Sequence, residues 1–295
     1  MTTDEVKLLT PRQRFWYWCR ERHQIHLRRR AGLPKPWTDD EVLRTVFFTN
    51  PYRENDKVTV WFRDAIRDPL RDHPDVLFAT VCFRWFNLPE TGEILGRTGL
   101  LTDWRPDVAL FHLDRVRKAG GKVFTGAYMI NSPAGEPKLE AIVRRVTNVW
   151  KDVPLLLSQW DLADGRMETM WTELTRYDGM GGFMAYEIVC DLRHTYLLEN
   201  AEDVNTWCNP GPGCIRGLYR LAGEEWASKG NNATAPPRPK DWLDRMKNLL
   251  AESRRRLTRM PPFEMREVEH SLCEFDKYER VLWGDGRAKR TYAGG

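Results

Sequence analysis

The sequence predicts an all-α protein, because helical signals recur along nearly all of its 295 residues. Capping patterns such as Thr10-Pro11 followed by Gln13 mark helix starts, and glycine or proline marks helix ends. Between these signals, apolar residues recur at helical spacing. Strand character is confined to residues 122–130, which are too isolated to build a sheet.

The helices can be placed in order along the chain. The first is expected over residues 11–31, since Gly32 and two prolines follow it. Thr38 with Glu41 repeats the capping pattern and predicts the next helix start. Apolar periodicity predicts further helices over residues 55–67, 74–87, 106–118, 137–151, 166–176, 183–198, 212–228, 239–258 and 263–281.

We expect one helical catalytic domain over residues 1–295, and two lobes, 1–135 and 136–283, are an alternative. The loop at residues 132–137 (SPAGEP) would separate those lobes. Residues 230–240 (GNNATAPPRPK) form the clearest linker, and residues 284–295 form a basic tail.

Composition indicates a folded, cytoplasmic protein. Hydrophobic residues make up 41% of the chain and charged residues 30%. No apolar stretch approaches the roughly 20 residues of a membrane span, and the N-terminus lacks the apolar segment of a signal peptide. The six cysteines are scattered without a CxxC pair, and Cys19, His23 and His26 lack partners to complete a metal site. We therefore expect no bound metal and no membrane partner.

Positive charge is concentrated in short runs. The net charge is only +4, yet residues 11–31 hold seven arginines and one glutamate. Such clustering favours a phosphate-backbone partner, although a solvated helix face is the alternative. Three runs share this character: Arg28, Arg29 and Arg30; Arg254, Arg255, Arg256 and Arg259; Arg287, Lys289 and Arg290.

A glycine pair indicates a helix-hairpin-helix motif. Residues 174–188 read LTRYDGMGGFMAYEI, and Gly179 and Gly181 stand between two apolar-periodic helical runs. Two glycines allow a tight turn and leave amides exposed at the start of the second helix, where they can bind a DNA phosphate regardless of sequence. A helix-helix turn without a ligand is the alternative.

A second glycine-rich block predicts another anion site. In residues 209–221 (NPGPGCIRGLYRL), Gly211 and Gly213 precede a helix that carries Arg216. The helix start and the guanidinium could both bind phosphate oxygens, although a capped turn is the alternative. No GxxxxGK[ST] occurs in the sequence, which excludes a P-loop nucleotide kinase at the level of motifs.

Two segments mix opposite charges with aromatic residues and are expected to line a polar cleft. They are residues 48–61 (FTNPYRENDKVTVW) and residues 267–280 (EVEHSLCEFDKYER). Exposed helical ion pairs are the alternative for each residue alone. The polar residues concerned are Asn50, Arg53, Asp56 and Lys57, with Glu269, His270, Glu274, Asp276, Lys277 and Tyr278.

Taken in order, FTNPYRENDKVTVW, TGAY (125–128), GFMAYEIVCDL (182–192), NPGPGCIRGL and HSLCEFDKYER resemble the helical DNA-hypermodification family of bacterial viruses. That family includes amino acid:DNA transferases, also called α-glutamyl/putrescinyl thymine pyrophosphorylases, and the helical domain of 5-hydroxymethyluracil DNA kinases. The resemblance spans roughly residues 10–292 and implies a helix-hairpin-helix fold distantly shared with DNA glycosylases.

The resemblance also implies a reaction on 5-hydroxymethyluracil in DNA that a kinase has already activated. The amine of a glycine-like amino acid or of a polyamine displaces the phosphate or pyrophosphate from the 5-methylene carbon of a flipped base. Because the chain lacks a P-loop, it resembles the transferase. The implied partners are DNA, the free amine and, functionally, a 5-hydroxymethyluracil DNA kinase. No cofactor is required, and a divalent metal at the pyrophosphate is left open.

Residue roles follow from the resemblance. Asp191 or Glu269 would deprotonate the incoming ammonium group. Positive side chains would neutralise the leaving phosphates, and Tyr128 would stack on the flipped base. The phosphate-neutralising residues are Arg53, Lys57, Arg216 and Lys277, and the remaining substrate-binding candidates are Asn50, Asp56, Thr125, His270 and Asp276.

Two other functions compete with this one. A lyase-free DNA glycosylase would use Asp203, which lies beyond the hairpin as the catalytic aspartate does in that class. The lysine of Schiff-base glycosylases is absent, since Gly182 and Phe183 stand in its place. A non-catalytic subunit would instead present DNA to a kinase and would not depend on any amine.

Overall fold

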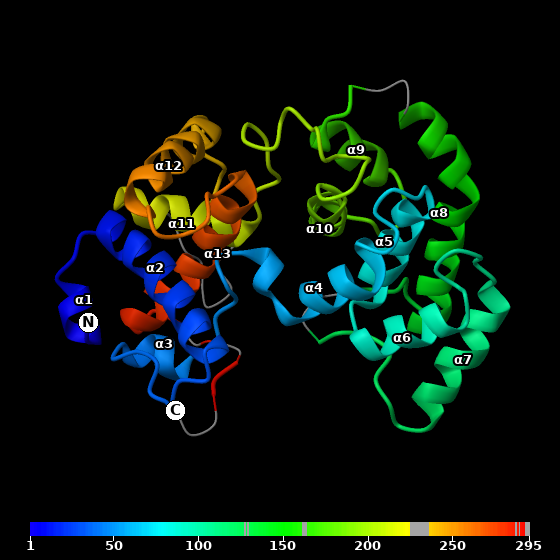
Figure 1. Ribbon diagram of the computed structural model, residues 1–295, viewed down its shortest axis with the longest axis horizontal. Coiled ribbons are helices and arrows are strands. Elements are labelled where there is room, and N and C mark those ends of the chain that lie inside the picture. The colour runs from blue at the N-terminus through cyan, green and yellow to red at the C-terminus, as the bar shows by residue number, and fades with distance from the viewer. Residues whose placement is uncertain are drawn as a thin grey trace. The chain divides into compact units, whose positions relative to one another are not determined.

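A computed structural model describes residues 1–126, 128, 130–160, 164–224, 236–286, 288 and 290–292. The described residues form helices and turns and no strand longer than a single bridge, between Val46 and Thr291. The predicted all-α class is confirmed (Figure 1). No described helix is both long and apolar enough to cross a bilayer.

The chain folds into two compact units. Unit 1 comprises residues 1–56 and 205–295, and unit 2 comprises residues 57–204. The lobes considered from the sequence, 1–135 and 136–283, have different bounds, because the loop at residues 132–137 lies inside unit 2. Residues 230–235 of the expected linker, and Arg287, Lys289 and 293–295 of the basic tail, lie outside the described residues.

Unit 1 contains α1 (Thr3–Lys7), α2 (Pro11–Arg30), α3 (Glu41–Thr45), the 3-10 turn η1 (Arg53–Asn55), α11 (Pro212–Ala222), α12 (Trp242–Arg256) and α13 (Met265–Leu282). Helix α13 is its centre, because it packs against α2, α3, α11 and α12 (Figure 1). Phe275 of α13 meets Phe15 of α2 edge to face, with ring centroids 5.4 Å apart. These buried aromatic contacts fix the register between α2 and α13.

Small residues let α11 lie very close to α13. A Cβ on Gly217 would lie 2.4 Å from the carbonyl oxygen of Leu272, and one on Gly213 would lie 2.4 Å from Cys273 Sγ. Real Cβ atoms do not approach other atoms so closely, so any side chain at either position would push the helices apart. Packing between helices thus accounts for glycine at position 213, and its role in an anion site stays a prediction.

Unit 2 contains α4 (Lys57–Phe62), the π-helical turn η2 (Arg63–Arg67), α5 (Asp75–Phe86), α6 (Pro89–Arg97), α7 (Pro106–Lys118), α8 (Lys138–Trp160), α9 (Met167–Leu174) and α10 (Gly182–Leu192). Helix α5 is its core, since residues 76–86 are all buried and α6, α8 and α10 surround it. A helix that is apolar on every side is expected in such a position. It ends at Asn87, whose φ of 47° breaks the helix.

Most helix starts follow the predicted local signals. Thr10 caps α2 through a reciprocal pair of hydrogen bonds with Gln13, as expected. The cap of α3 is Asp40 rather than Thr38, because Asp40 Oδ1 accepts hydrogen bonds from the amides of Val42 and Leu43. Thr38 Oγ1 instead accepts a hydrogen bond from the Asp40 amide at 3.2 Å.

Candidate functional site

Helix α13 carries most of the expected site residues of unit 1, but it presents them on two different faces. Glu269, Asp276 and Arg280 lie on the face toward α11, and His270, Glu274 and Lys277 lie on the face toward residues 48–50. Spacings of three, four or seven residues keep side chains on one helical face, whereas adjacent residues point about 100° apart. The sequence predicts that these residues line a single polar cleft, but the structure places them on two separate faces of α13.

The first of these groups is the Thr49 face, formed by Thr49, His270, Glu274 and Lys277. Thr49 Oγ1 is hydrogen-bonded to His270 Nε2 at 2.6 Å, and its amide donates to Glu274 Oε2 at 2.9 Å. Lys277 Nζ lies 2.6 Å from Glu274 and 4.8 Å from the centroid of the Phe48 ring. A cation, a carboxylate and an imidazole thus share one partly exposed patch.

Two buried polar atoms of unit 1, one on Asn50 and one on His23, have no hydrogen-bond partner among the described residues. Asn50 is 3% exposed, and its Oδ1 accepts the Tyr52 amide at 3.0 Å, but its Nδ2 has no hydrogen-bond partner among the described residues. The His23 ring packs against Tyr52 with centroids 5.1 Å apart, and His23 Nδ1 is likewise unsatisfied. An unmade buried hydrogen bond costs about 1–3 kcal/mol, so these atoms favour a polar ligand.

Glu267 is a candidate that sequence reasoning missed. Burial raises its pKa to about 7, although a hydrogen bond from the Glu264 amide, 2.9 Å long, works in the opposite direction. Its charge also raises the pKa of Tyr52, after the larger effect of burial. A carboxyl group that titrates near neutral pH can exchange protons. Its signal in the sequence is weak, because Glu267 stands at an ordinary capping-box position of α13.

The second group is the arginine cluster, in which Arg216, Arg220 and Arg280 surround the buried carboxylate of Asp276. Arg216 Nε lies 2.8 Å from Asp276 Oδ2, Arg220 Nε lies 2.9 Å from Oδ1, and Arg280 Nε lies 3.4 Å from Oδ2. The side chains of the three arginines are between 15% and 31% exposed, whereas that of Asp276 is 1% exposed. Asp276 positions these three cations, and Arg220 Nη1 also lies 3.8 Å from Asp285 Oδ2.

Glu269 stands at the start of α11. Its Oε2 pairs with Arg266 at 2.6 Å, and its Oε1 accepts a 3.4 Å hydrogen bond from the amide of Gly211, the cap residue of α11. The start of α11, which the sequence predicts to bind an external anion, is therefore contacted by the carboxylate of Glu269. This hydrogen bond links the start of α11 to α13.

Asp191 is held in the interior of unit 2. It is 0% exposed and receives two hydrogen bonds from Arg84, at 2.5 Å and 3.0 Å. Arg84 also donates to Asn87 Oδ1 at 2.7 Å. This geometry makes Asp191 part of a buried polar network between α5 and α10, in which Arg84 holds both carboxylate oxygens.

Asp203 has a structural explanation. It is 0% exposed, and its two oxygens accept the amides of Met167 and Glu168 at 2.8 Å and 3.0 Å. These amides open α9, so Asp203 caps this helix from a distant position in the chain. Both oxygens are engaged, which argues against Asp203 as a glycosylase carboxylate.

The expected turn between two helices lies between α9 and α10, although α10 ends at Leu192 rather than at residue 198. Gly179 has a φ of +71°, and a Cβ there would lie 2.3 Å from the guanidinium carbon of Arg145. Gly181 is exposed, has extended backbone, and a Cβ there would meet nothing within 4 Å. Gly179 thus supports the turn, and phosphate binding by the Gly181 region stays a prediction.

An aromatic pair lies at the first turn of α10. The Tyr128 hydroxyl donates to Glu187 Oε2 at 2.7 Å, and the Tyr128 ring meets Phe183 edge to face at 5.1 Å. Phe183 is 56% exposed, which is unusual for a phenylalanine. Exposed rings suit stacking against a nucleobase, and the stacking role of Tyr128 stays a prediction.

The other expected residues are scattered. Arg53 is buried in η1, Asp56 is half-buried, and the exposed Lys57 opens α4 in unit 2. The amide of Thr125 donates to the Phe86 carbonyl at 2.9 Å, so the strand-like segment supports α5. Arg28 pairs with Glu21 at 2.9 Å, and Arg29 and Arg30 are exposed. Within the described ranges no group of three or more potential metal ligands converges.

Comparison with known proteins identifies the family. Residues 10–288 match the model of the family described as 5-hmdU DNA kinase, helical domain. The 5-hmdU DNA kinase of Bacillus phage SP10 is 30% identical over 229 residues, which cover 71% of this chain and 34% of that protein. The chain thus spans about a third of the length of this relative. No solved structure matches. The family match covers nearly the whole chain, and the chain therefore belongs to the 5-hmdU DNA kinase helical-domain family.

Proposed function

We propose that this chain transfers an amine onto phosphorylated or pyrophosphorylated 5-hydroxymethyluracil in DNA. The nitrogen of an amino acid or polyamine attacks the 5-methylene carbon, and the bond from that carbon to the phosphate oxygen breaks. The phosphate or pyrophosphate leaves with the electron pair, and a carboxylate of the protein takes the proton of the amine. The substrate base is suggested by the name of the phage relative and by the family.

The observation that carries this proposal is the arginine cluster around Asp276. Departure of a phosphate or pyrophosphate from carbon concentrates negative charge on the leaving oxygens, and preorganised cations stabilise that charge. Arg216, Arg220 and Arg280 are held around the carboxylate of Asp276, and Arg220 also lies 3.8 Å from Asp285. Guanidinium groups can also bind phosphate oxygens at two points. Their partial exposure leaves them open to a ligand.

Glu269 is the better supported of the two expected bases. An amino acid amine is protonated at neutral pH and must lose its proton before it attacks. Asp191 would have to give up its buried pair with Arg84 to accept that proton. Glu269 is also paired, with Arg266 and the Gly211 amide, but it lies on the same face of α13 as the arginine cluster. We assign the proton transfer to Glu269 and treat Asp191 as structural.

We assign recognition of the substrate to the Thr49 face and Asn50. The unsatisfied Nδ2 of Asn50 can donate to a carbonyl of the base, and Lys277 can meet a phosphate or a carboxylate. In unit 2, taken by itself, the turn at Gly179 to Gly181 would hold the DNA backbone, and the Tyr128–Phe183 pair would stack on an exposed base. No cofactor enters this reaction, and a divalent ion could only assist the leaving group.

One observation favours a second function. The phage relative is named a kinase and is about three times as long as the part matched here. A helical module without a P-loop motif could present DNA to a separate kinase and catalyse nothing itself. Such a protein would bind DNA but consume no amine. The glycosylase alternative is less favoured, because both oxygens of Asp203 are engaged in capping α9.

A nucleoside assay tests the proposal. Purified protein is incubated with duplex DNA that contains enzymatically phosphorylated or pyrophosphorylated 5-hydroxymethyluracil, without ATP, together with each amino acid and polyamine in turn. The DNA is digested to nucleosides, which are quantified by mass spectrometry. We expect loss of the activated base, gain of one amine adduct, and release of one phosphate or pyrophosphate per adduct. Parallel reactions with magnesium and with EDTA measure any metal requirement.

Two results would contradict the transferase. If the activated base survives with every amine while the DNA remains bound, the presenting function takes its place. Release of free base with loss of the glycosidic bond would indicate a glycosylase instead. The exposed Arg44 of α3 offers a matched control, since Arg44→Gln removes a cation from the same unit away from the arginine cluster.

A further inference from the structure

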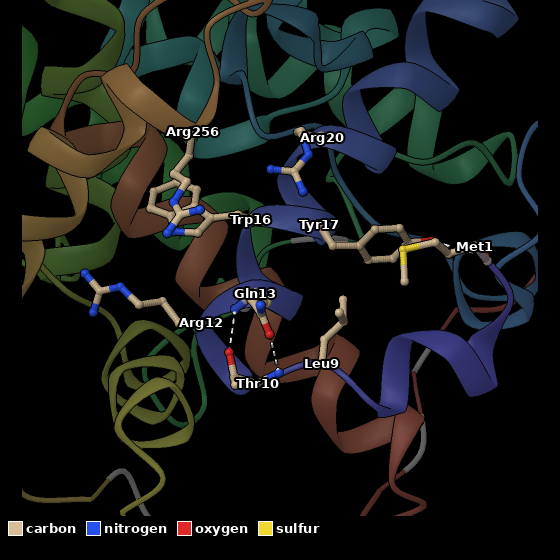
Figure 2. A pocket seen from close by; sticks show the side chains of 9 residues that line it. All are labelled: Met1, Leu9, Thr10, Arg12, Gln13, Trp16, Tyr17, Arg20 and Arg256. Atoms are coloured by element: carbon tan, nitrogen blue, oxygen red, sulfur yellow. Dashed lines mark hydrogen bonds between the residues drawn. The ribbon is translucent and has the colours of Figure 1, made fainter.

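Unit 1 contains a pocket that none of the expected site residues lines. It encloses about 450 Å³ and lies between the loop before α2, the first half of α2 and the end of α12. Figure 2 shows its lining, in which three arginines, Arg12, Arg20 and Arg256, stand around Trp16 and Tyr17. The volume is within the range of roughly 300–1,000 Å³ that small ligands or ligand groups occupy.

The charge of this pocket is unbalanced. Glu252 does not line the pocket, but it accepts hydrogen bonds from two lining residues, from Arg12 Nε at 2.6 Å and from Arg256 Nε at 3.1 Å. Arg20 is exposed and forms no ion pair with any described residue. Two further carboxylates act on Tyr17, but Asp40 also caps α3 and Glu21 pairs with Arg28. The lining itself holds three guanidinium groups and no carboxylate, which favours an anion.

Glu252 fixes the two arginines it binds. Its side chain is 9% exposed and also accepts the indole N–H of Trp16 at 3.1 Å. Burial alone would raise the pKa of Glu252, but the hydrogen bonds from Arg12 and Arg256 outweigh burial and lower it. Glu252 therefore stays ionised and holds Arg12 and Arg256 in position. An anion that enters the pocket meets cations whose side-chain entropy is already reduced.

More positive charge lies near Arg256 in the sequence. Arg254 and Arg255 precede it in the last turn of α12, Arg259 follows the end of the helix, and all three are exposed and form no ion pair with the described residues. Arginines in the last helical turn stabilise the helix dipole, which explains part of this run. The dipole of α12 does not explain Arg12 and Arg20, which project from a different helix.

We infer that this pocket binds a phosphodiester group of the DNA backbone, away from the reacting base. The inference rests on the proposed action on DNA and adds a contact that fixes the position of the duplex. The walls favour a backbone phosphate over a nucleobase, since Trp16 and Tyr17 are only 2% and 6% exposed and offer no free ring face. The exposed arginines in and after the last turn of α12 suit further phosphates of a nucleic-acid backbone.

Binding to unmodified duplex DNA tests this inference. Fluorescence anisotropy measures affinity for two duplexes of unrelated sequence between 50 and 300 mM salt, about the range in which phosphate contacts dominate. Each lost phosphate contact should reduce the slope of log affinity against log salt by about 0.9. We expect Arg20→Gln to lower the slope by about one contact, and Arg12→Gln with Arg20→Gln and Arg256→Gln to lower it further. Both duplexes should lose affinity equally.

Controls separate binding from folding. Arg44→Gln removes an exposed arginine of the same unit and should leave the slope unchanged. Glu252→Gln should weaken DNA binding less than the triple variant, because it disorders two arginines without removing them. Circular dichroism and thermal unfolding establish that each variant is folded before its affinity is interpreted.

Three outcomes would overturn the inference: an unchanged slope in the folded triple variant, a loss confined to one duplex, or binding of millimolar pyrophosphate or mononucleotide that the triple variant loses while its affinity for both duplexes stays that of the wild type. The last would assign the pocket to a small phosphate compound. Because the duplexes carry no modified base and no amine is added, the binding result does not depend on the proposed transferase activity. Failure of the amine assay and failure of this contact are therefore distinguishable.

Discussion

Arg84 and Asp191 form a two-point ion pair in the interior of unit 2, with Nε to Oδ2 at 2.5 Å and Nη2 to Oδ1 at 3.0 Å. The side chains of the two residues are 1% and 0% exposed. Arg84 sits on the fully buried part of α5, and Asp191 sits near the end of α10. The pair therefore joins the central helix of the unit to the helix that follows the glycine turn.

Asp191→Ala should destabilise the protein strongly, because it leaves the guanidinium of Arg84 buried without a counter-charge. Removing one partner of such a pair typically costs about 3–5 kcal/mol. Urea unfolding measures the free energy of unfolding directly. Asp178→Ala is a matched control, since Asp178 pairs with Arg145 at 3.1 Å but its side chain is 55% exposed, and its loss should cost much less. A stable Asp191→Ala protein whose amine transfer recovers at high pH would restore Asp191 as the base.

Glu267 should make stability depend on pH. Its pKa in the folded protein is about 7, above the ordinary value of 4.5, so between these values the folded protein binds more protons than the unfolded chain. The free energy of unfolding should therefore fall as the pH rises from about 4.5 to 7, by roughly 1–3 kcal/mol. Glu267→Gln, which resembles the protonated side chain, should flatten this dependence and match the wild type near pH 4.5. A wild-type profile in the variant would show that Glu267 does not titrate in this range.

Gly217→Ala should lower stability by about 1–3 kcal/mol, because the new methyl group would meet the Leu272 carbonyl at 2.4 Å and force α11 away from α13. Gly211→Ala is the matched control. Its methyl group would meet only Glu269 Oε1, at 3.8 Å, which is ordinary contact. Thermal unfolding of both variants measures the difference. Equal melting temperatures would show that α11 can move without cost.

Substitutions at the two glycines of the turn in unit 2 should affect different properties: stability at Gly179 and DNA binding at Gly181. Gly179→Ala forces a positive φ on alanine and collides with Arg145, so it should lower the free energy of unfolding by on the order of 1–3 kcal/mol. Gly181→Leu meets open space and should leave stability nearly unchanged, while it weakens binding to all DNA sequences about equally. Unfolding and anisotropy measurements together separate the effects. Sequence-specific loss in the Gly181 variant would indicate base contacts instead.

Local signals predicted most of the helices, because capping and periodicity act within a few residues. Helix α6 was missed, and α8 runs through Pro154 to Trp160 although a proline inside a helix removes a hydrogen bond. The capping role of Asp203 could not be predicted from its neighbours in the sequence, because it caps a helix that begins 36 residues earlier. The bounds of unit 1 could not be predicted from local patterns either, because its two segments are separated in the sequence by the whole of unit 2.

The candidate site was predicted in part for a related reason. The segment from Glu267 to Arg280 was correctly singled out as helical and rich in polar residues, but its residues were grouped by sequence proximity. Helical spacing already separates Asp276 from Lys277 by about 100°. Which neighbours each face meets depends on α11 and on the residues around Thr49, and those contacts are set by the fold.

The last prediction separates the two chemical tasks of amine transfer. Arg216→Gln removes one cation from Asp276 and should slow departure of the leaving group by on the order of 10²-fold, with no recovery at higher pH. Glu269→Gln removes the expected base, so its rate should recover partly as the pH approaches the pKa of the free amine, where more amine is already unprotonated. Lys277→Gln, on the Thr49 face, should raise KM more than it lowers kcat if Lys277 serves recognition. The adduct is quantified against pH and amine concentration in each variant, and DNA binding is measured alongside. If Arg216→Gln and Glu269→Gln respond to pH in the same way, one group cannot be the base and the other the phosphate ligand, and these assignments fail even where the transfer itself is observed.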